Sequence, residues 1–144
     1  MKTPWHLWFI GILSLLWNAG GAFDYVMMKT RSSAYLAQLT PEQLAFYDGY
    51  PLWVNLAWAL GVWGAVLGSV LLLLRSRFAV HAFVLSFLGM AGNFIWGYLI
   101  SATPMTEMMA DAGLFPLIFT IAIVVVAVLL IIYALRMTQK GHLR

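Results

Sequence analysis

Residues 114–135 read LFPLIFTIAIVVVAVLLIIYAL, and no charged side chain interrupts them. The part from Ile121 to Ile132 contains no polar side chain at all. A helix of about 20 apolar residues can cross the hydrocarbon core of a bilayer, which is roughly 30 Å thick. The stretch is too long for a buried strand and too uniformly apolar for an amphipathic surface helix. It therefore predicts a membrane-spanning helix.

Three further stretches share this length and composition. They run from about Trp5 to Tyr25, from Leu52 to Leu74 and from Val80 to Ser101. The chain of 144 residues is 63% hydrophobic and 9% charged, whereas soluble domains carry about 25% charged residues because their surface faces water. We therefore expect one domain, residues 1–144, that is an all-α integral membrane protein with four transmembrane helices in an up-down bundle.

The first stretch has an alternative interpretation as a cleaved signal peptide, because residues 19–22 are all small. Trp17 and Asn18 interrupt its apolar region, and the basic segment before it is weak. Signal peptides need both features intact. We therefore expect the first span to be retained.

The basic residues predict the orientation of the bundle, because Lys and Arg are retained on the cytoplasmic side of a membrane. Six of the eight bases fall in the N-terminal segment, the second loop and the C-terminal segment: Lys2, Arg75, Arg77, Arg136, Lys140 and Arg144. The other two bases and all five acids fall at the opposite side: Lys29, Arg31, Asp24, Glu42, Asp48, Glu107 and Asp111. We therefore expect both termini in the cytoplasm.

The first loop, from Met27 to Pro51, contains a signal for the start of a helix. Thr40 can serve as an N-cap, Pro41 suits the first helical position, and Gln43 can complete a capping box. Aromatic side chains follow at short intervals. We expect a short interfacial helix here, on the outer side, with its rings at the level of the lipid headgroups.

Small residues predict where the helices approach one another, since membrane helices associate where small side chains let their backbones come close. Such residues recur at helical spacing in the second and third spans: Gly61, Gly64, Gly68, Gly89 and Gly97. The fourth span is uniformly apolar instead. We expect the first three spans to make the intimate contacts and the fourth to face lipid.

Three polar side chains within the spans are candidate ligand-binding residues. Asn18 and Asn93 are the most deeply placed strong hydrogen-bonding groups. They form either a polar substrate site between the first and third spans or interhelical hydrogen bonds, and we favour the second interpretation. Asp24, near the outer end of the first span, either binds a cation or a partner, or is neutralised by Lys29 or Arg31; again we favour the second.

Five methionines lie on the predicted outer side: Met27, Met28, Met105, Met108 and Met109. Thioether sulfur selects Cu(I), so these residues are a candidate copper site. Methionine is also an adaptable apolar filler at interfaces. Because no cysteine and no outer histidine accompanies them, we expect no metal site.

Composition argues against several other classes of function. The chain has no cysteine, and its net charge of +3 is small and scattered, so we expect no disulfide and no nucleic-acid partner. His6 and His81 lie at matching depth and suggest a haem, but histidines at the interface are the simpler interpretation, and we expect no cofactor. The chain lacks an HExxH motif, a glycine-rich phosphate loop and a hydrolytic triad on one side of the membrane. We expect no enzyme activity.

Three strings in the first half of the chain carry a family resemblance: LLWNAGGAFDYVM (15–27), LTPEQLAFY (39–47) and WALGVWGAVLGSVLLLLRSRFAV (58–80). They resemble a group of short four-span membrane proteins of proteobacteria that are sometimes loosely labelled sugar transporters. The resemblance implies a bacterial inner membrane, and its label implies transport of a small solute. It assigns no functional residues.

These observations predict a non-enzymatic protein surrounded by membrane lipids that acts by self-association, as a homo-oligomer, or as an accessory subunit of a larger membrane complex. The alternative is an oligomeric transporter of a small solute, with a sugar as one candidate; handling of Cu(I) at the periplasmic face is a further alternative. Because four helices of this length enclose little space, we expect any cavity to require more than one copy of the chain.

Overall fold

A computed structural model describes residues 2–144 of the chain. Its long helices are α1 (Trp5–Lys29), α4 (Leu52–Leu73), α5 (Phe78–Ile95) and α7 (Phe115–Gln139). A π-helical turn, Trp96–Ile100, continues α5. These four segments are long and apolar enough to cross a membrane. The expectation of an all-helical, multi-pass membrane protein is thereby confirmed.

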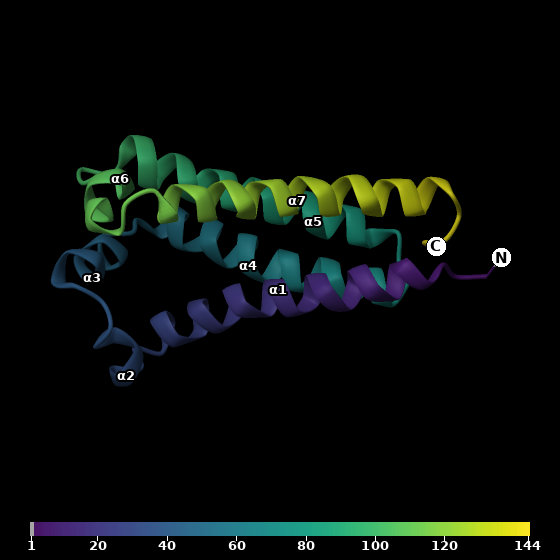
Figure 1. The fold of residues 1–144 in the computed structure, drawn as a ribbon, viewed down its shortest axis with the longest axis horizontal. Coiled ribbons are helices and arrows are strands. Elements are labelled where there is room, and N and C mark those ends of the chain that lie inside the picture. The colour runs from purple at the N-terminus through teal and green to yellow at the C-terminus, as the bar shows by residue number, and fades with distance from the viewer. Residues whose placement is uncertain (1) are drawn as a thin grey trace.

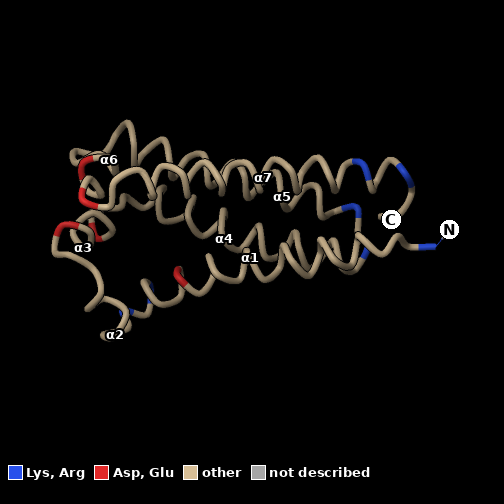
Figure 2. Tube along the Cα trace, viewed as in Figure 1, with Lys and Arg blue, Asp and Glu red and all other residues tan. Residues whose placement is uncertain are grey.

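Successive long helices run in opposite directions, so the chain forms an up-down bundle with both described termini at one end (Figure 1). We call this the terminal end and the opposite end the loop end. α4 lies between α1 and α5, while α7 packs mainly on α5 and is the least buried of the four long helices. Figure 2 shows most Lys and Arg residues at the terminal end and the acids toward the loop end.

The loop end carries the short elements α2 (Ser33–Leu36), α3 (Pro41–Asp48), α6 (Met105–Met108) and the 3-10 turn η2 (Ala110–Ala112). The predicted start of α3 is confirmed. The Gln43 backbone N–H donates to the Thr40 hydroxyl oxygen at 3.2 Å, and the Thr40 N–H donates to the Gln43 side-chain oxygen at 3.1 Å. This capping box satisfies donors that the first helical turn leaves unpaired.

Glycines bring the backbones of α4 and α5 into contact. A Cβ atom added to Gly89 would lie 2.5 Å from the carbonyl oxygen of Ala57 and 2.7 Å from the backbone nitrogen of Gly61. A Cβ on Gly64 would lie 3.0 Å from that of Ser86. Such contacts leave no room for a side chain, so close packing here requires glycine.

Two other glycines contact side chains rather than backbone. Gly68 faces the ring of Phe83, which a Cβ would approach to 2.5 Å. Gly97 leaves ordinary van der Waals space toward Met105 and Phe46, with distances of 3.4 Å and 3.5 Å. The tight helix–helix seam therefore runs from Ala57 toward the terminal end, and Gly97 lies outside it.

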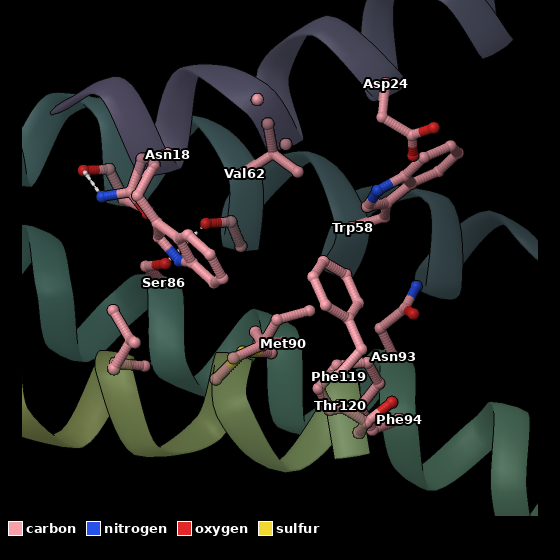
Figure 3. Close-up of a pocket in the computed structure, with 18 of the residues that line it drawn as sticks. Asn18, Asp24, Trp58, Val62, Ser86, Met90, Asn93, Phe94, Phe119 and Thr120 are labelled. Atoms are coloured by element: carbon pink, nitrogen blue, oxygen red, sulfur yellow. Dashed lines mark hydrogen bonds between the residues drawn. The ribbon is translucent and has the colours of Figure 1, made fainter. Parts of the chain in front are cut away.

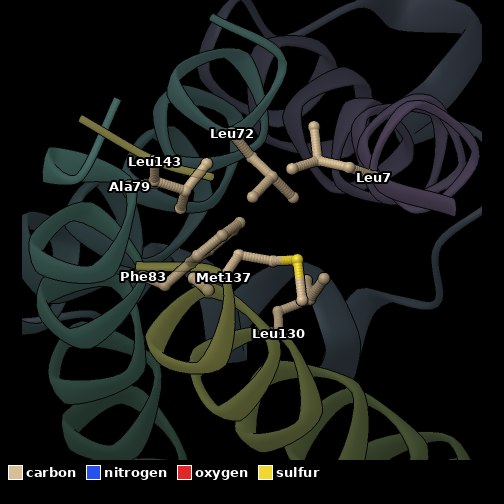
Figure 4. Close-up of a cluster of buried hydrophobic side chains, with 8 residues drawn as sticks. Leu7, Leu72, Ala79, Phe83, Leu130, Met137 and Leu143 are labelled. Atoms are coloured by element: carbon tan, nitrogen blue, oxygen red, sulfur yellow. The ribbon is translucent and has the colours of Figure 1, made fainter. Parts of the chain in front are cut away.

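A buried hydrophobic cluster closes the terminal end of the bundle (Figure 4). It joins side chains of all four long helices with one from the C-terminal segment, and we call it the terminal cluster: Leu7, Leu72, Ala79, Phe83, Leu130, Ala134, Met137 and Leu143. Backbone hydrogen bonds fix the C-terminal segment there: the Arg144 N–H donates to the Arg75 carbonyl at 2.8 Å, and the Arg77 N–H donates to the Arg144 carbonyl at 3.0 Å.

A second cluster closes the loop end. We call it the aromatic cluster, and its buried members are Phe46, Tyr50, Val54 and Trp96. The ring centroids of Tyr50 and Trp96 lie 5.0 Å apart, and those of Phe46 and Trp96 lie 5.4 Å apart. Phe46 of α3 and Tyr50 after it thus pack against α4 and against Trp96 at the end of α5. The two clusters leave the middle of the bundle between them.

Candidate functional site

A cavity of about 730 Å³ lies between the terminal cluster and the aromatic cluster. All four long helices contribute to its lining, together with α3 and α6. Phe83 and Leu130 of the terminal cluster line its floor, and Tyr50 of the aromatic cluster lines its opposite end. The expectation that a cavity requires more than one copy of the chain is therefore wrong, because the glycine seam brings the backbones of α4 and α5 together while those of α1 and α7 lie farther apart.

Most of the cavity wall is apolar. Its middle is lined by Val62 of α4, Met90 and Phe94 of α5, and Ile123 and Val126 of α7. Aliphatic and aromatic groups of this kind offer dispersion contacts and few hydrogen bonds. The wall therefore suits an apolar molecule better than a hydrated one.

Polar groups gather at the loop end of the cavity. This end is lined by Asp24 of α1, Tyr47 of α3, Tyr50 just after α3, Trp58 of α4 and Asn93 of α5. Figure 3 shows Asp24, Trp58 and Asn93 toward one end of the cavity, with Asn18 and Ser86 toward the other. The cavity therefore has an apolar body with polar side chains at both ends, and we call the end that holds the charged Asp24 the polar end.

Asp24 is not neutralised as expected. The Tyr35 hydroxyl donates a hydrogen bond to the Asp24 carboxylate. Arg31 instead pairs with Asp48 at 3.0 Å, and Lys29 donates to the Asn55 side-chain oxygen. Within residues 2–144, Asp24 forms no salt bridge. The prediction failed because α2 and α3 turn Arg31 toward Asp48, away from the cavity.

Asn93 has an unused hydrogen-bond donor. Its side chain is 9% exposed, and its amide nitrogen has no partner in hydrogen-bonding geometry among the described residues. The nearby Tyr50 side chain is close enough for Asn93 to oppose the rise in the pKa of Tyr50. Figure 3 shows this amide pointing from α5 toward the side of the cavity where Trp58 and Asp24 lie. An unpaired buried donor costs about 1–3 kcal/mol. Such a cost is expected where a side chain forms its hydrogen bond with a ligand.

The π-helical turn begins three residues after Asn93. The Ser101 N–H donates to the Trp96 carbonyl at 2.8 Å, which is the wider i to i+5 pattern of a π-helix. Trp96 is buried against the aromatic cluster. Interruptions of this kind occur frequently at functional sites. The π-helical turn therefore lies next to Asn93, the residue that α5 contributes to the polar end of the cavity.

Asn18 has a different role from Asn93. Its amide nitrogen donates to the Ser69 hydroxyl at 2.9 Å and to the Ala65 carbonyl at 3.2 Å. Ser14 also donates to Ser69, at 3.0 Å. These bonds join α1 to α4. Asn18 thus holds helices together, but its partner is the second span, and it does not meet Asn93.

Aromatic rings surround the polar end of the cavity. The Trp58 ring stacks on Tyr47, with centroids 5.8 Å apart, and contacts Tyr25 at 4.9 Å and Tyr50 at 5.8 Å. The Lys29 ammonium lies outside the cavity lining, 5.4 Å from the centroid of the Trp58 ring. The negative face of an aromatic ring attracts cations. The Trp58 ring therefore already attracts one cation, the Lys29 ammonium, which does not line the cavity.

Tyr47, in the last turn of α3, and Tyr50, just after α3, stay protonated to high pH. Burial, and then the negative charge of Asp24, raises the pKa of Tyr47 to about 12. Burial also raises the pKa of Tyr50. The charge of Asp24 therefore reaches the tyrosines across the cavity end. Sequence reasoning missed both tyrosines as site residues, because their spacing after the capping box indicated only that aromatic rings cluster there.

The cavity reaches the molecular surface between α1 and α7. Its lining residues on α4 and α5 are buried or half-buried, whereas several on α1 and α7 are exposed: Leu16, Trp17, Gly20, Gly21, Phe115 and Phe119. α1 and α7 meet where His6 hydrogen-bonds Tyr133 at 2.6 Å and where the rings of Trp17 and Phe119 lie 6.0 Å apart. Toward the loop end, α1 diverges from α7 (Figure 1).

The five outer methionines do not form one group. Met105 and Met109 line the cavity, and Met108 packs against the aromatic cluster. Met27 and Met28 lie at the end of α1, which Figure 1 shows well apart from α6. No cluster of histidine and carboxylate side chains that could hold a metal occurs within residues 2–144. The methionines near the cavity contribute flexible apolar surface.

No protein-family model, curated protein or solved structure matches the chain. The chemistry of the cavity therefore has to be inferred from its own side chains.

Proposed function

We propose that the protein binds a hydrophobic small molecule inside the bilayer and exchanges it with the surrounding lipid. The observation that carries the proposal is the cavity of about 730 Å³ within a single chain. Ligand sites commonly occupy about 300–1,000 Å³ and combine apolar walls with a few polar groups. The cavity matches both criteria.

The composition of the wall supports a hydrophobic molecule rather than a free sugar. A sugar needs hydrogen-bond partners for its hydroxyl groups, and leaving them unpaired in an apolar site is costly. Here the polar side chains are confined to the two ends, with Val62, Met90 and Ile123 between them. The site favours small-molecule binding over association as the main role, because one chain supplies the whole lining.

Access through the side of the bundle supports exchange with lipid. Gly20 and Gly21 line the cavity on α1, and no atom lies within 4 Å of a Cβ added to either. Phe119 lines the opposite edge on α7 and is exposed. The opening of the cavity toward the bilayer therefore lies between small residues of α1 and the Phe119 ring of α7. A hydrophobic molecule dissolved in the bilayer can enter there.

The proposed membrane is a bacterial inner membrane, with the terminal end in the cytoplasm and α3 near the outer interface. The bases gathered at the terminal end support this orientation (Figure 2). A fluorescent protein fused after Arg144 should fluoresce, and alkaline phosphatase at the same position should be inactive. Activity of the phosphatase fusion would contradict the orientation.

A neutral photoreactive probe tests the binding proposal. The protein is reconstituted in phosphatidylcholine nanodiscs, irradiated with an alkyl benzophenone, and the labelled residues are identified by mass spectrometry. Labelling is expected at cavity residues such as Met90, because the probe can enter from the bilayer. Gly21→Leu should reduce this labelling several-fold, since it adds a bulky side chain at the cavity edge, where a Cβ meets open space.

Ala19→Leu provides the matched control, because Ala19 is exposed on α1 and is outside the cavity lining. It should leave the labelling of Met90 unchanged. Labelling confined to lipid-facing residues of α7, with none at Met90 in the unmodified protein, would overturn the proposed function.

A further inference from the structure

We infer that the ligand is a lipophilic monovalent cation, with an apolar body in the cavity and its positive centre at the loop end beside Asp24. This inference rests on the proposed function, since it names the chemical class of the molecule that the cavity binds. Charge, aromatic rings and an unused hydrogen-bond donor meet at that end of the cavity, and each contributes a separate argument.

Asp24 places a negative charge at the polar end of the cavity. Asp24 lines the cavity, lies within α1 and forms no salt bridge among residues 2–144. Acidic residues within membrane spans are rare, usually face a cavity or pair with another group, and commonly mark a substrate path. Attraction between opposite charges is stronger in a low-dielectric site than in water. A positive centre beside Asp24 would supply the missing counter-charge.

Aromatic rings surround this charge at the polar end of the cavity. Tyr47 and Trp58 line the same end of the cavity as Asp24, and their rings stack on each other. Cations bind the faces of such rings most strongly where water is excluded. Lys29 already lies over Trp58 from outside the cavity, which shows that the electrostatics of this ring suit a cation. Lys29 itself is held by Asn55.

The Asn93 amide nitrogen offers an unpaired donor at the same end. It is nine-tenths buried and points toward the polar end of the cavity (Figure 3). A ligand that carries an acceptor atom next to its positive centre would satisfy this donor. A purely aliphatic ligand would leave the Asn93 amide nitrogen without a hydrogen-bond partner and the Asp24 carboxylate without a counter-charge, which is costly in a buried site.

The test measures binding of radiolabelled tetraphenylphosphonium, a lipophilic cation, to the purified full-length protein in detergent. We expect saturable binding that Asp24→Asn weakens by at least about tenfold, because the carboxylate provides the counter-charge. Asparagine keeps the size of the side chain and an acceptor for Tyr35. Asp24→Glu should retain most of the affinity.

Asp111→Asn is the matched control, because it removes an exposed carboxylate at the same end of the molecule that does not line the cavity. It should leave the affinity for the cation unchanged. The neutral benzophenone should label Met90 equally in the Asp24→Asn variant and the unmodified protein, which verifies that the variant folds and keeps its cavity.

The outcomes separate the two proposals. Equal affinity of the Asp24→Asn variant and the unmodified protein for tetraphenylphosphonium would overturn the inference. So would a lack of cation binding in a protein whose Met90 is labelled by the neutral probe, although the proposed function would then stand. Failure of both probes to reach the cavity would overturn both.

Discussion

Two asparagines toward opposite ends of the cavity have opposite energetic roles in this bundle. Asn18 donates to Ser69 and Ala65 and thereby joins α1 to α4. Asn93 keeps its amide nitrogen unpaired in the cavity. Interhelical hydrogen bonds in membranes contribute about 0.6–2 kcal/mol, whereas an unpaired buried donor costs about 1–3 kcal/mol. The difference lies in what each side chain faces.

Replacing each asparagine with leucine should therefore change stability in opposite directions. Asn18→Leu should lower the melting temperature, because it breaks two bonds between helices. Asn93→Leu should leave it unchanged or raise it, because it removes an unpaired donor. Thermal unfolding of both variants in the same detergent measures the difference. A similar decrease in both would show that Asn93 also holds the bundle together.

The raised pKa of Tyr47 predicts a loss of stability in alkaline solution. A free tyrosine has a pKa of about 10, and burial followed by the charge of Asp24 raises the pKa of Tyr47 to about 12. Its contribution to stability is fully present below pH 10 and is lost as the pH rises from about 10 to about 12, because the unfolded chain then releases a proton that the folded chain retains.

Tyr47→Phe should therefore weaken the dependence of stability on pH in that range. Melting temperatures of the variant and the unmodified protein are compared from pH 7 to pH 12. The two curves should run parallel below pH 9, and the unmodified protein should lose stability more steeply above pH 10. Parallel curves over the whole range would contradict the role given to Tyr47.

At the scale of elements, the α4–α5 seam depends on the absence of a side chain at one position. A Cβ on Gly89 would overlap the backbone of α4, with the Ala57 carbonyl oxygen 2.5 Å away. A Cβ on Gly92, three residues later on α5, would meet its nearest atoms at 3.7 Å, which is ordinary contact. One glycine is therefore required by packing, and the other is not.

Gly89→Ala should destabilise the protein by about 1–3 kcal/mol, because overpacking forces the backbones apart. Gly92→Ala, its matched control, should be neutral or stabilising, since alanine is the better helix former. Thermal unfolding distinguishes the two. If the two substitutions changed the free energy of unfolding equally, the requirement for glycine at position 89 would be contradicted.

At the scale of the whole molecule, the bundle is closed at both ends and less tightly closed at one side. The terminal cluster and the aromatic cluster seal the ends. Beyond the contact between Trp17 and Phe119, α1 diverges from α7. A ligand inside the bundle therefore has its shortest path to lipid through the side between α1 and α7.

Joining α1 to α7 near this contact should slow exchange of a ligand. The chain has no cysteine, so Trp17→Cys with Phe119→Cys can be linked selectively by a short bifunctional thiol reagent. Release of a bound probe should then slow several-fold. The control pair, His6→Cys with Tyr133→Cys, lies where the two helices already meet, and linking it should leave the rate unchanged. Equal rates for both pairs would exclude the proposed route.

The sequence by itself determined the four membrane-spanning segments and the capped start of α3. Both follow from local rules: about 20 apolar residues make a helix stable in hydrocarbon, and Thr40 with Gln43 satisfies the donors of a single helical turn. The glycines also indicated close packing, although only the structure pairs Gly89 with Ala57 across the seam.

The tertiary structure alone decided what the polar residues do. Whether Asp24 meets Arg31, and whether Asn93 finds a partner, depends on how α2, α3 and the π-helical turn orient side chains that are far apart in sequence. The cavity likewise exists because α4 and α5 approach closely while α1 and α7 do not. Such spacing arises from the simultaneous packing of all four helices, which no single segment encodes.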